Sequence, residues 1–87
     1  MKFSVLITVY CTEVPDYLHR ALESIWDDQV LRPSQIVLIK DGPLTAELDV
    51  VTDEWQRRLG DVMDVFALSA NVGLGDALRF GVNYCKY

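Results

Sequence analysis

The sequence predicts an α/β fold in which parallel strands and helices alternate, and three observations support this. Three short runs rich in Val, Ile and Leu are separated by segments whose apolar residues recur at helical spacing. Each run ends in polar or turn-forming residues. The intervening segments are long enough to hold a crossover helix between parallel strands. The pattern β-α-β-α-β-α is therefore expected to form half of a doubly wound parallel sheet with three layers.

The first strand is expected at residues 2–10. Apolar residues follow one another in it without strict alternation, at Val5, Leu6, Ile7 and Val9. This pattern is typical of a parallel strand that is buried on both faces. The residues that follow Tyr10 should then lie at the carboxyl edge of the sheet, where open α/β folds bind their ligands.

The next elements are two helices and a second strand. Pro15 opens the first helix, because a proline in the first turn sacrifices no hydrogen bond, and its apolar stripe comprises Leu18, Ala21, Leu22, Ile25 and Trp26. A short buried strand at 36–39 ends in the turn residues 40–43. The second helix is expected at 45–59, with Thr45 as its N-cap and Gly60 as its stop.

A third strand at 62–68 and a loop at 69–73 precede a third helix. The apolar positions of this helix are Leu74, Ala77, Leu78, Gly81, Val82 and Cys85. Right-handed crossovers place the strands in the order 3-2-1, which leaves the first strand at an edge of the sheet. The unpaired N–H and C=O groups of a long hydrophobic edge strand readily form hydrogen bonds with another strand. We therefore expect a fourth strand from chain beyond Tyr87, or pairing between two copies as a homodimer.

Composition limits the classes of function. The chain has 87 residues, of which 51% are hydrophobic and 24% charged, as in an ordinary folded domain. The formal net charge of −5 argues against nucleic acid as a partner. No apolar run reaches the roughly 18–20 residues of a membrane span, and the start lacks the pattern of a signal peptide. These features predict a cytoplasmic location.

Three loops should converge on the carboxyl edge of the sheet, at 10–13, 40–43 and 71–75. Asp41 is the strongest candidate, because an ionised carboxylate accepts hydrogen bonds from a ligand N–H or hydroxyl. The alternative is an aspartate that only stabilises its own turn. Gly73 and Gly75 would let a phosphate or carbonyl group approach the start of the third helix.

The adjacent carboxylates Asp27 and Asp28 could in principle hold a metal ion. They end the first helix and should lie at the opposite, amino edge of the sheet, so we do not assign a metal site to them. No Ser-His-Asp or Cys-His combination is apparent in the sequence.

The strand ends and loops carry three motifs at well-separated positions. They read Ser4-Val-Leu-Ile-Thr-Val-Tyr10, Ile36-Val-Leu-Ile-Lys-Asp41-Gly-Pro-Leu-Thr45 and Asn71-Val-Gly73-Leu-Gly75-Asp-Ala77. In these motifs and their spacing the chain resembles the opening of family 2 glycosyltransferases, which are inverting enzymes with the Rossmann-like GT-A fold. The resemblance runs through the whole chain.

The resemblance implies a nucleotide-binding role for several residues. Thr8 and Tyr10 would help hold the base of a nucleotide-sugar donor, and Asp41 would accept a hydrogen bond from that base, which favours a UDP-sugar. Asn71 and Gly73 match the family motif Asn-x-Gly-x-x-x-Ala beside the pyrophosphate and ribose.

Four further residues match the family less well or depart from it. Glu13 lies in the donor loop, and Gly75 belongs to the third motif. Leu78 and Arg79 stand where many members carry Arg and Asn, so the sequence departs from the family there.

The resemblance also implies what residues 1–87 do not contain. In the family, a metal-binding Asp-x-Asp and an acceptor-activating carboxylate follow later in the chain. We therefore expect residues 1–87 to be the N-terminal nucleotide-sugar-binding part of a truncated domain, with no catalytic residue and no metal ligand, and inactive alone.

The full-length enzyme would use Mg²⁺ or Mn²⁺ and a sugar or glycan acceptor, in polysaccharide or glycoconjugate synthesis and in association with a membrane. The alternative is a complete small α/β binding or signalling module without catalysis.

Overall fold

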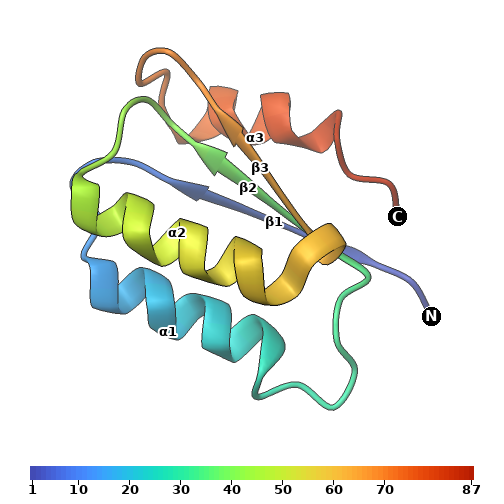
Figure 1. The fold of residues 1–87 in the computed structure, drawn as a ribbon. Helices are drawn as coiled ribbons and strands as arrows, with labels where there is room; N and C mark the ends of the chain where they lie inside the picture. The colour runs from blue at the N-terminus through green and yellow to red at the C-terminus, as the bar shows by residue number, and fades with distance from the viewer.

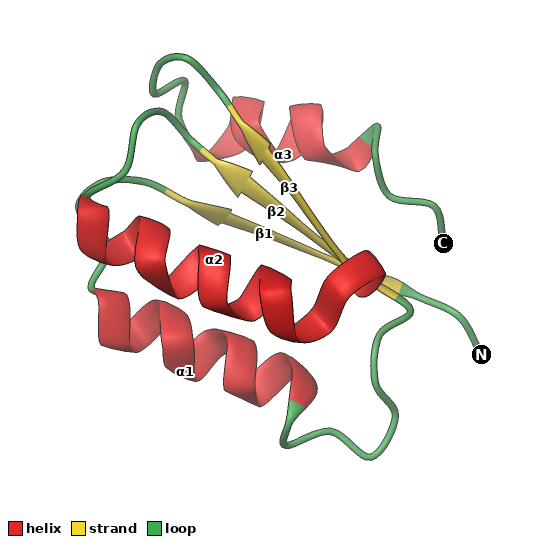
Figure 2. Ribbon diagram, viewed as in Figure 1, coloured by secondary structure: helices red, strands yellow, loops and turns green.

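The computed structural model describes all residues, 1–87, and contains the six predicted elements in the predicted order (Figures 1 and 2). A single 3-10 turn, Gly60–Val62, is added before the third strand. The elements are β1 (Ser4–Val9), α1 (Pro15–Trp26), β2 (Gln35–Lys40), α2 (Ala46–Leu59), β3 (Met63–Ala67) and α3 (Leu74–Val82). No helix has the length and apolar character needed to cross a membrane.

The three strands form one parallel sheet in which β2 lies between β1 and β3, which confirms the predicted strand order. Ile7 of β1 pairs with Leu38 of β2, and Leu38 pairs with Val65 of β3. All three strands end at the same edge of the sheet (Figure 2). One side of β1 has no neighbouring strand, and pairing of this side with another copy stays a prediction.

Helices cover both faces of the sheet, so the predicted three layers are confirmed. In Figure 1, α1 and α2 lie in front of the sheet and α3 lies behind it. The larger core cluster, on the side of α1 and α2, consists of Val9, Leu18, Leu22, Ile36, Leu38, Leu48, Trp55, Leu59 and Met63. A smaller cluster, under α3, consists of Val37, Ile39 and Ala77. Successive residues of β2 thus alternate between two apolar layers, as a strand buried on both faces requires.

Local sequence signals set the helix ends. Pro15 occupies the first turn of α1, and Thr45 caps α2 by accepting a hydrogen bond from the Leu48 amide at 3.2 Å. The apolar positions of the third helix were expected to extend to Cys85, but α3 ends at Val82. Residues 83–85 continue as a turn, in which each amide donates to the carbonyl three residues earlier. The Tyr84 carbonyl and the Lys86 amide then bond to a buried side chain of β2.

That side chain is Gln35, at the start of β2, which is 2% exposed and uses its whole amide group. Its oxygen accepts hydrogen bonds from the Ser4 hydroxyl at 2.7 Å and from the Lys86 amide at 2.9 Å. Its nitrogen donates to the Asp64 carboxylate at 2.7 Å and to the Tyr84 carbonyl at 2.9 Å. Gln35 thereby joins β1, β3 and the segment after α3 at the amino edge of the sheet.

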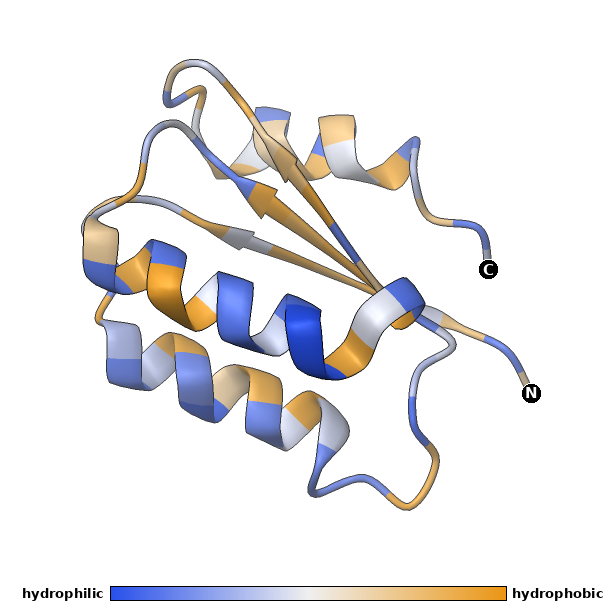
Figure 3. Cartoon of the chain, in the orientation of Figure 1, coloured by the Kyte–Doolittle hydropathy of each residue, from blue (hydrophilic) through white to orange (hydrophobic).

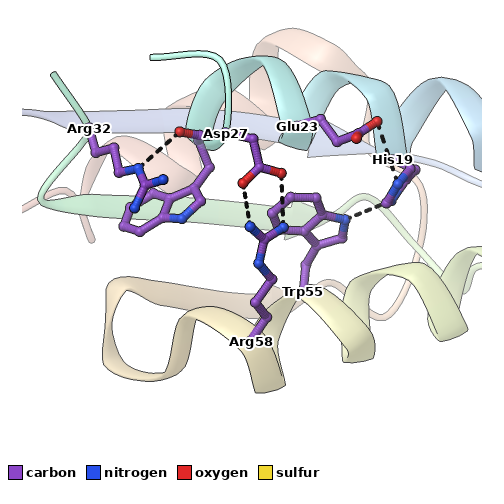
Figure 4. A network of polar contacts seen from close by, with 7 residues as sticks. His19, Glu23, Asp27, Arg32, Trp55 and Arg58 are labelled. Atoms are coloured by element: carbon purple, nitrogen blue, oxygen red, sulfur yellow. Dashed lines mark hydrogen bonds and ion pairs between the residues drawn. The ribbon is translucent and has the colours of Figure 1, made fainter. Parts of the chain in front are cut away.

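Polar contacts also join α1 to α2 (Figure 4). Trp55 donates its indole N–H to Nδ1 of His19 at 3.0 Å. Arg58 forms a two-pronged ion pair with Asp27, and its guanidinium lies 4.6 Å from the centre of the Trp55 ring. Hydrophilic residues occur along both helices (Figure 3). Some of them, such as Asp27 and Arg58, bind the two helices to each other.

The Asp27–Arg58 pair predicts a pH-dependent contribution to stability. The hydrogen bonds from Arg58 hold the pKa of Asp27 below its ordinary value. The stabilisation is therefore present above the unfolded-state value of about 3.9 and is lost as the pH falls through the lower folded-state pKa. We expect Asp27→Asn to lower the denaturation midpoint slightly at pH 7 and to converge with the parent chain at about pH 2.

The matched control for this measurement is Asp28→Asn, which removes the same charge from a neighbouring residue that makes no ion pair. Urea denaturation of the three proteins at several pH values measures the difference. A gap between Asp27→Asn and the parent chain that is as large in acid as at pH 7 would contradict the assignment to this ion pair.

Candidate functional site

A pocket of about 530 Å³ opens at the carboxyl edge of the sheet, where β1 and β2 end. Its lining is Thr8, Val9, Tyr10, Glu13, Asp41, Asn71, Gly73 and Leu74. Six of these eight residues belong to the set that the sequence singled out. The structure thus brings residues from three loops, far apart along the chain, to one site.

The first wall of the pocket is the end of β1 and the loop after it. Thr8 and Val9 belong to the strand, and Tyr10 follows it with 46% of its surface exposed. The loop turns at once, because the Glu13 amide donates a hydrogen bond to the Tyr10 carbonyl at 3.0 Å. Tyr10 and Glu13, at the two ends of this turn, both line the pocket.

Asp41 lines the pocket directly after β2 and is only 4% exposed. Its backbone amide donates to the Val9 carbonyl at 2.7 Å, which continues the hydrogen bonding between β1 and β2. Its carboxylate accepts from the amides of Val72 at 2.7 Å and Gly73 at 3.1 Å, and from the Asn71 side chain at 3.3 Å. Asp41 therefore holds a distant loop in place, and it does not merely stabilise its own turn.

Gly42 allows the second and third loops to approach closely. It has φ of +89°, and a Cβ added to it would lie 2.7 Å from the backbone nitrogen of Asn71. Only glycine satisfies both conditions without strain. From the sequence, Gly42 could be recognised as a turn residue, but the partner that comes so close to it could not.

Two of the residues singled out by sequence lie outside the pocket lining. Gly75 is exposed within the first turn of α3. The Arg79 side chain is 82% exposed and pairs with Asp76, at 3.3 Å, on the same helix. Val9 and Leu74 line the pocket although sequence reasoning did not select them. Their positions directly before Tyr10 and after Gly73 were the available signal.

The charges of the site restrict its chemistry. The lining holds two carboxylates, Glu13 and Asp41, and no lysine, arginine or histidine. No group of three or more His, Cys, Asp or Glu side chains in the chain could hold a metal ion. An aromatic ring beside acceptor groups suits a planar ligand with N–H and hydroxyl donors. The residues present can bind and orient such a ligand.

The chain resembles known proteins along almost its whole length. Residues 4–87 match the family described as Glycosyl transferase family 2. Over 86 residues, 99% of this chain and 30% of the relative, it is 44% identical to a UDP-Gal:alpha-D-GlcNAc-diphosphoundecaprenol beta-1,3-galactosyltransferase of Escherichia coli. It is 40% identical to the amylovoran biosynthesis glycosyltransferase AmsE of Erwinia amylovora, over 98% of this chain and 31% of that relative.

An uncharacterized glycosyltransferase of Haemophilus influenzae is 38% identical over 100% of this chain and 32% of its own length. The chain thus spans about a third of the length of these three relatives. No solved structure matches it.

Proposed function

This chain belongs to glycosyl transferase family 2, and we propose that it forms the nucleotide-recognition wall of an enzyme that transfers a sugar from a nucleotide-diphosphate donor with inversion. The observation that carries the proposal is the pocket at the carboxyl edge of the sheet, where Thr8, Tyr10, Asp41, Asn71 and Gly73 meet. Open α/β sheets bind nucleotides at this edge.

Each part of the pocket suits a part of the donor. The exposed ring of Tyr10 can stack on the base. The Asp41 carboxylate accepts three hydrogen bonds from residues 71–73. Because its two oxygens offer about four acceptor positions, it retains room for the N–H of a base such as uracil. Asn71 and Gly73, at the start of α3, would face the diphosphate, where helix amides favour negative charge.

The named relatives support the identity of the substrates. The E. coli relative is named for UDP-Gal and for a diphosphoundecaprenol-linked sugar, and the Erwinia relative for amylovoran biosynthesis. We accordingly assign this chain's parent enzyme a UDP-sugar donor and a sugar or glycan acceptor in polysaccharide or glycoconjugate synthesis. A cytoplasmic site of action at the membrane surface fits an acceptor of that kind.

The divalent cation expected for the parent enzyme, Mg²⁺ or Mn²⁺, would offset charge on the leaving diphosphate. The residues of this chain do not form a group of three or more His, Cys, Asp or Glu side chains that could hold such an ion. Their contribution is to bind and orient the donor. We therefore expect the 87-residue chain to bind a nucleotide and to release no sugar from it.

Tyr10→Ala tests the proposed binding of the base. Stacking of a base on an aromatic side chain contributes about 1–3 kcal/mol, so the affinity for UDP should fall about tenfold or more. Tyr17→Ala is the matched control, because Tyr17 is also exposed, at 60%, and lies outside the pocket lining. Backbone NMR spectra recorded during a UDP titration measure both affinities.

The same spectra separate the proposal from its alternative. Shifts that concentrate at the pocket residues are expected for a nucleotide-recognition wall. Equal affinities of the two variants, or no response of any pocket residue to UDP, would instead favour a small α/β binding module with another ligand. Incubation with UDP-galactose and analysis of free galactose checks the expected lack of sugar release.

A further inference from the structure

The single histidine of the chain, His19, lies in the contact between α1 and α2 (Figure 4). The indole N–H of Trp55 donates a hydrogen bond to its Nδ1 at 3.0 Å. Because an indole nitrogen only donates, Nδ1 must carry no proton. The other ring nitrogen, Nε2, lies 3.5 Å from the Glu23 carboxylate, one turn further along α1. The two contacts together specify a neutral imidazole with its proton on Nε2.

Protonation of this imidazole is incompatible with its hydrogen bond to Trp55. An imidazolium carries a hydrogen on both nitrogens, so Nδ1 and the indole nitrogen would then be two donors that face each other. The Glu23 carboxylate, in contrast, can accept a hydrogen bond from Nε2 in either charge state. One added proton therefore removes the hydrogen bond from His19 to α2 and leaves its contact within α1 in place.

Charged groups from both helices lie near the imidazole. Glu23 and Asp27 belong to α1, and Glu54 and Arg58 belong to α2. The carboxylates attract an imidazolium, whereas the Arg58 guanidinium repels it and is itself paired with Asp27. This ion pair persists in mild acid, because the hydrogen bonds from Arg58 hold the pKa of Asp27 below its ordinary value. The strand residues in the core cluster that contains Trp55 are apolar.

The surroundings of Trp55 make the loss of its acceptor consequential. Trp55 is only 2% exposed, so water has little access to its indole N–H while the contact is intact. A groove of about 130 Å³, lined by His19, Glu54, Trp55 and Arg58, can admit water once the imidazole turns away.

We propose that His19 is a pH-sensitive switch in the contact between α1 and α2. The neutral imidazole binds Trp55 and connects the helices, and the protonated imidazole releases Trp55 while the Asp27–Arg58 pair still holds them together. Histidine is the side chain that ordinarily changes its charge between about pH 5 and 8, so the release is expected in that range. The switch requires no ligand in the pocket.

NMR spectroscopy of the ¹⁵N-labelled 87-residue chain at pH 8 and pH 5 tests the proposal. At pH 8 the ring nitrogens of His19 should show an unprotonated Nδ1 and a protonated Nε2. The protection of the Trp55 indole hydrogen against exchange, relative to an unstructured peptide at the same pH, should fall about tenfold from pH 8 to pH 5, because a buried donor loses its acceptor. The Trp26 indole, whose ring contacts Arg32, is the internal reference and should change less than about twofold.

Two variants separate the imidazole from other effects of acid. His19→Gln offers Trp55 a carbonyl oxygen that does not titrate, so the protection should be equal at both pH values. His19→Phe offers no acceptor, and the protection should be low at both. The matched control is Arg20→Gln, because Arg20 is the exposed neighbour of His19 on α1, and this variant should retain the full pH dependence.

Three results would overturn the proposal. The first is a proton on Nδ1 of His19 at pH 8. The second is protection of the Trp55 indole hydrogen that is unchanged between pH 8 and pH 5 in the parent chain. The third is a fall in protection that is as large in His19→Gln or His19→Phe as in the parent chain.

Discussion

Replacing Gln35 with leucine is expected to lower the free energy of unfolding by about 3 kcal/mol, because it leaves several polar groups without hydrogen-bond partners at once. Leucine has nearly the volume of glutamine, so packing changes little. The variant loses both acceptor bonds to Ser4 and Lys86 and both donor bonds to Asp64 and Tyr84. Partners near the surface can turn to water, which keeps the loss below the sum of four bonds.

Two measurements establish this effect. Urea denaturation gives the change in stability, and amide hydrogen exchange should accelerate at Lys86, whose amide loses its acceptor. Gln29→Leu is the matched control, because Gln29 is exposed and its single side-chain bond, to the Ser24 carbonyl, lies on the surface. A Gln35→Leu variant as stable as this control, with unchanged exchange at Lys86, would show that the Gln35 side chain does not stabilise the segment after α3.

Gly42→Ala is expected to destabilise the chain by about 3 kcal/mol and to disturb the pocket. Two effects add. First, an alanine at a φ of +89° carries backbone strain of about 1–2 kcal/mol. In addition, the new Cβ would meet the Asn71 backbone, which must move. Since residues 71–73 bond to Asp41, their displacement should weaken nucleotide binding as well as folding.

Two other glycines separate these effects. Gly73 has φ of +92° but nothing within 4 Å of an added Cβ, so Gly73→Ala should show the strain alone. Gly75 lies in α3 with neither an unusual φ nor a close neighbour, and Gly75→Ala should stabilise the chain by about 0.5–1 kcal/mol. Denaturation midpoints that were the same for Gly42→Ala and Gly73→Ala would refute a contribution from close loop approach.

The sequence was sufficient to predict the fold because its signals are local. Buried parallel strands need continuous apolar runs, and amphipathic helices need a stripe, as in the residues from Leu18 to Trp26. Right-handed crossovers then order the strands. The membership of the pocket followed, since parallel strands end at one edge, and motifs at strand ends must meet there.

What could not be predicted depends on contacts between distant residues. The sequence marked Asp41 as an acceptor but not that Val72 and Gly73, more than 30 residues away, donate to it. Gln35 reaches Lys86 across 51 positions, just beyond the turn that follows α3. Helical spacing continues to Cys85 in the sequence, whereas α3 ends at Val82 and residues 83–85 form a turn with hydrogen bonds to carbonyls three residues earlier.

The placement of the two chain ends has a practical consequence. Both lie at the amino edge of the sheet (Figure 1), and the Tyr87 amide donates to the Ser4 hydroxyl at 3.2 Å. The pocket opens at the opposite edge, about the length of a strand away. A fluorophore, affinity tag or sensor surface attached to either end would thus leave the mouth of the pocket unobstructed, so immobilised chain should bind nucleosides as free chain does.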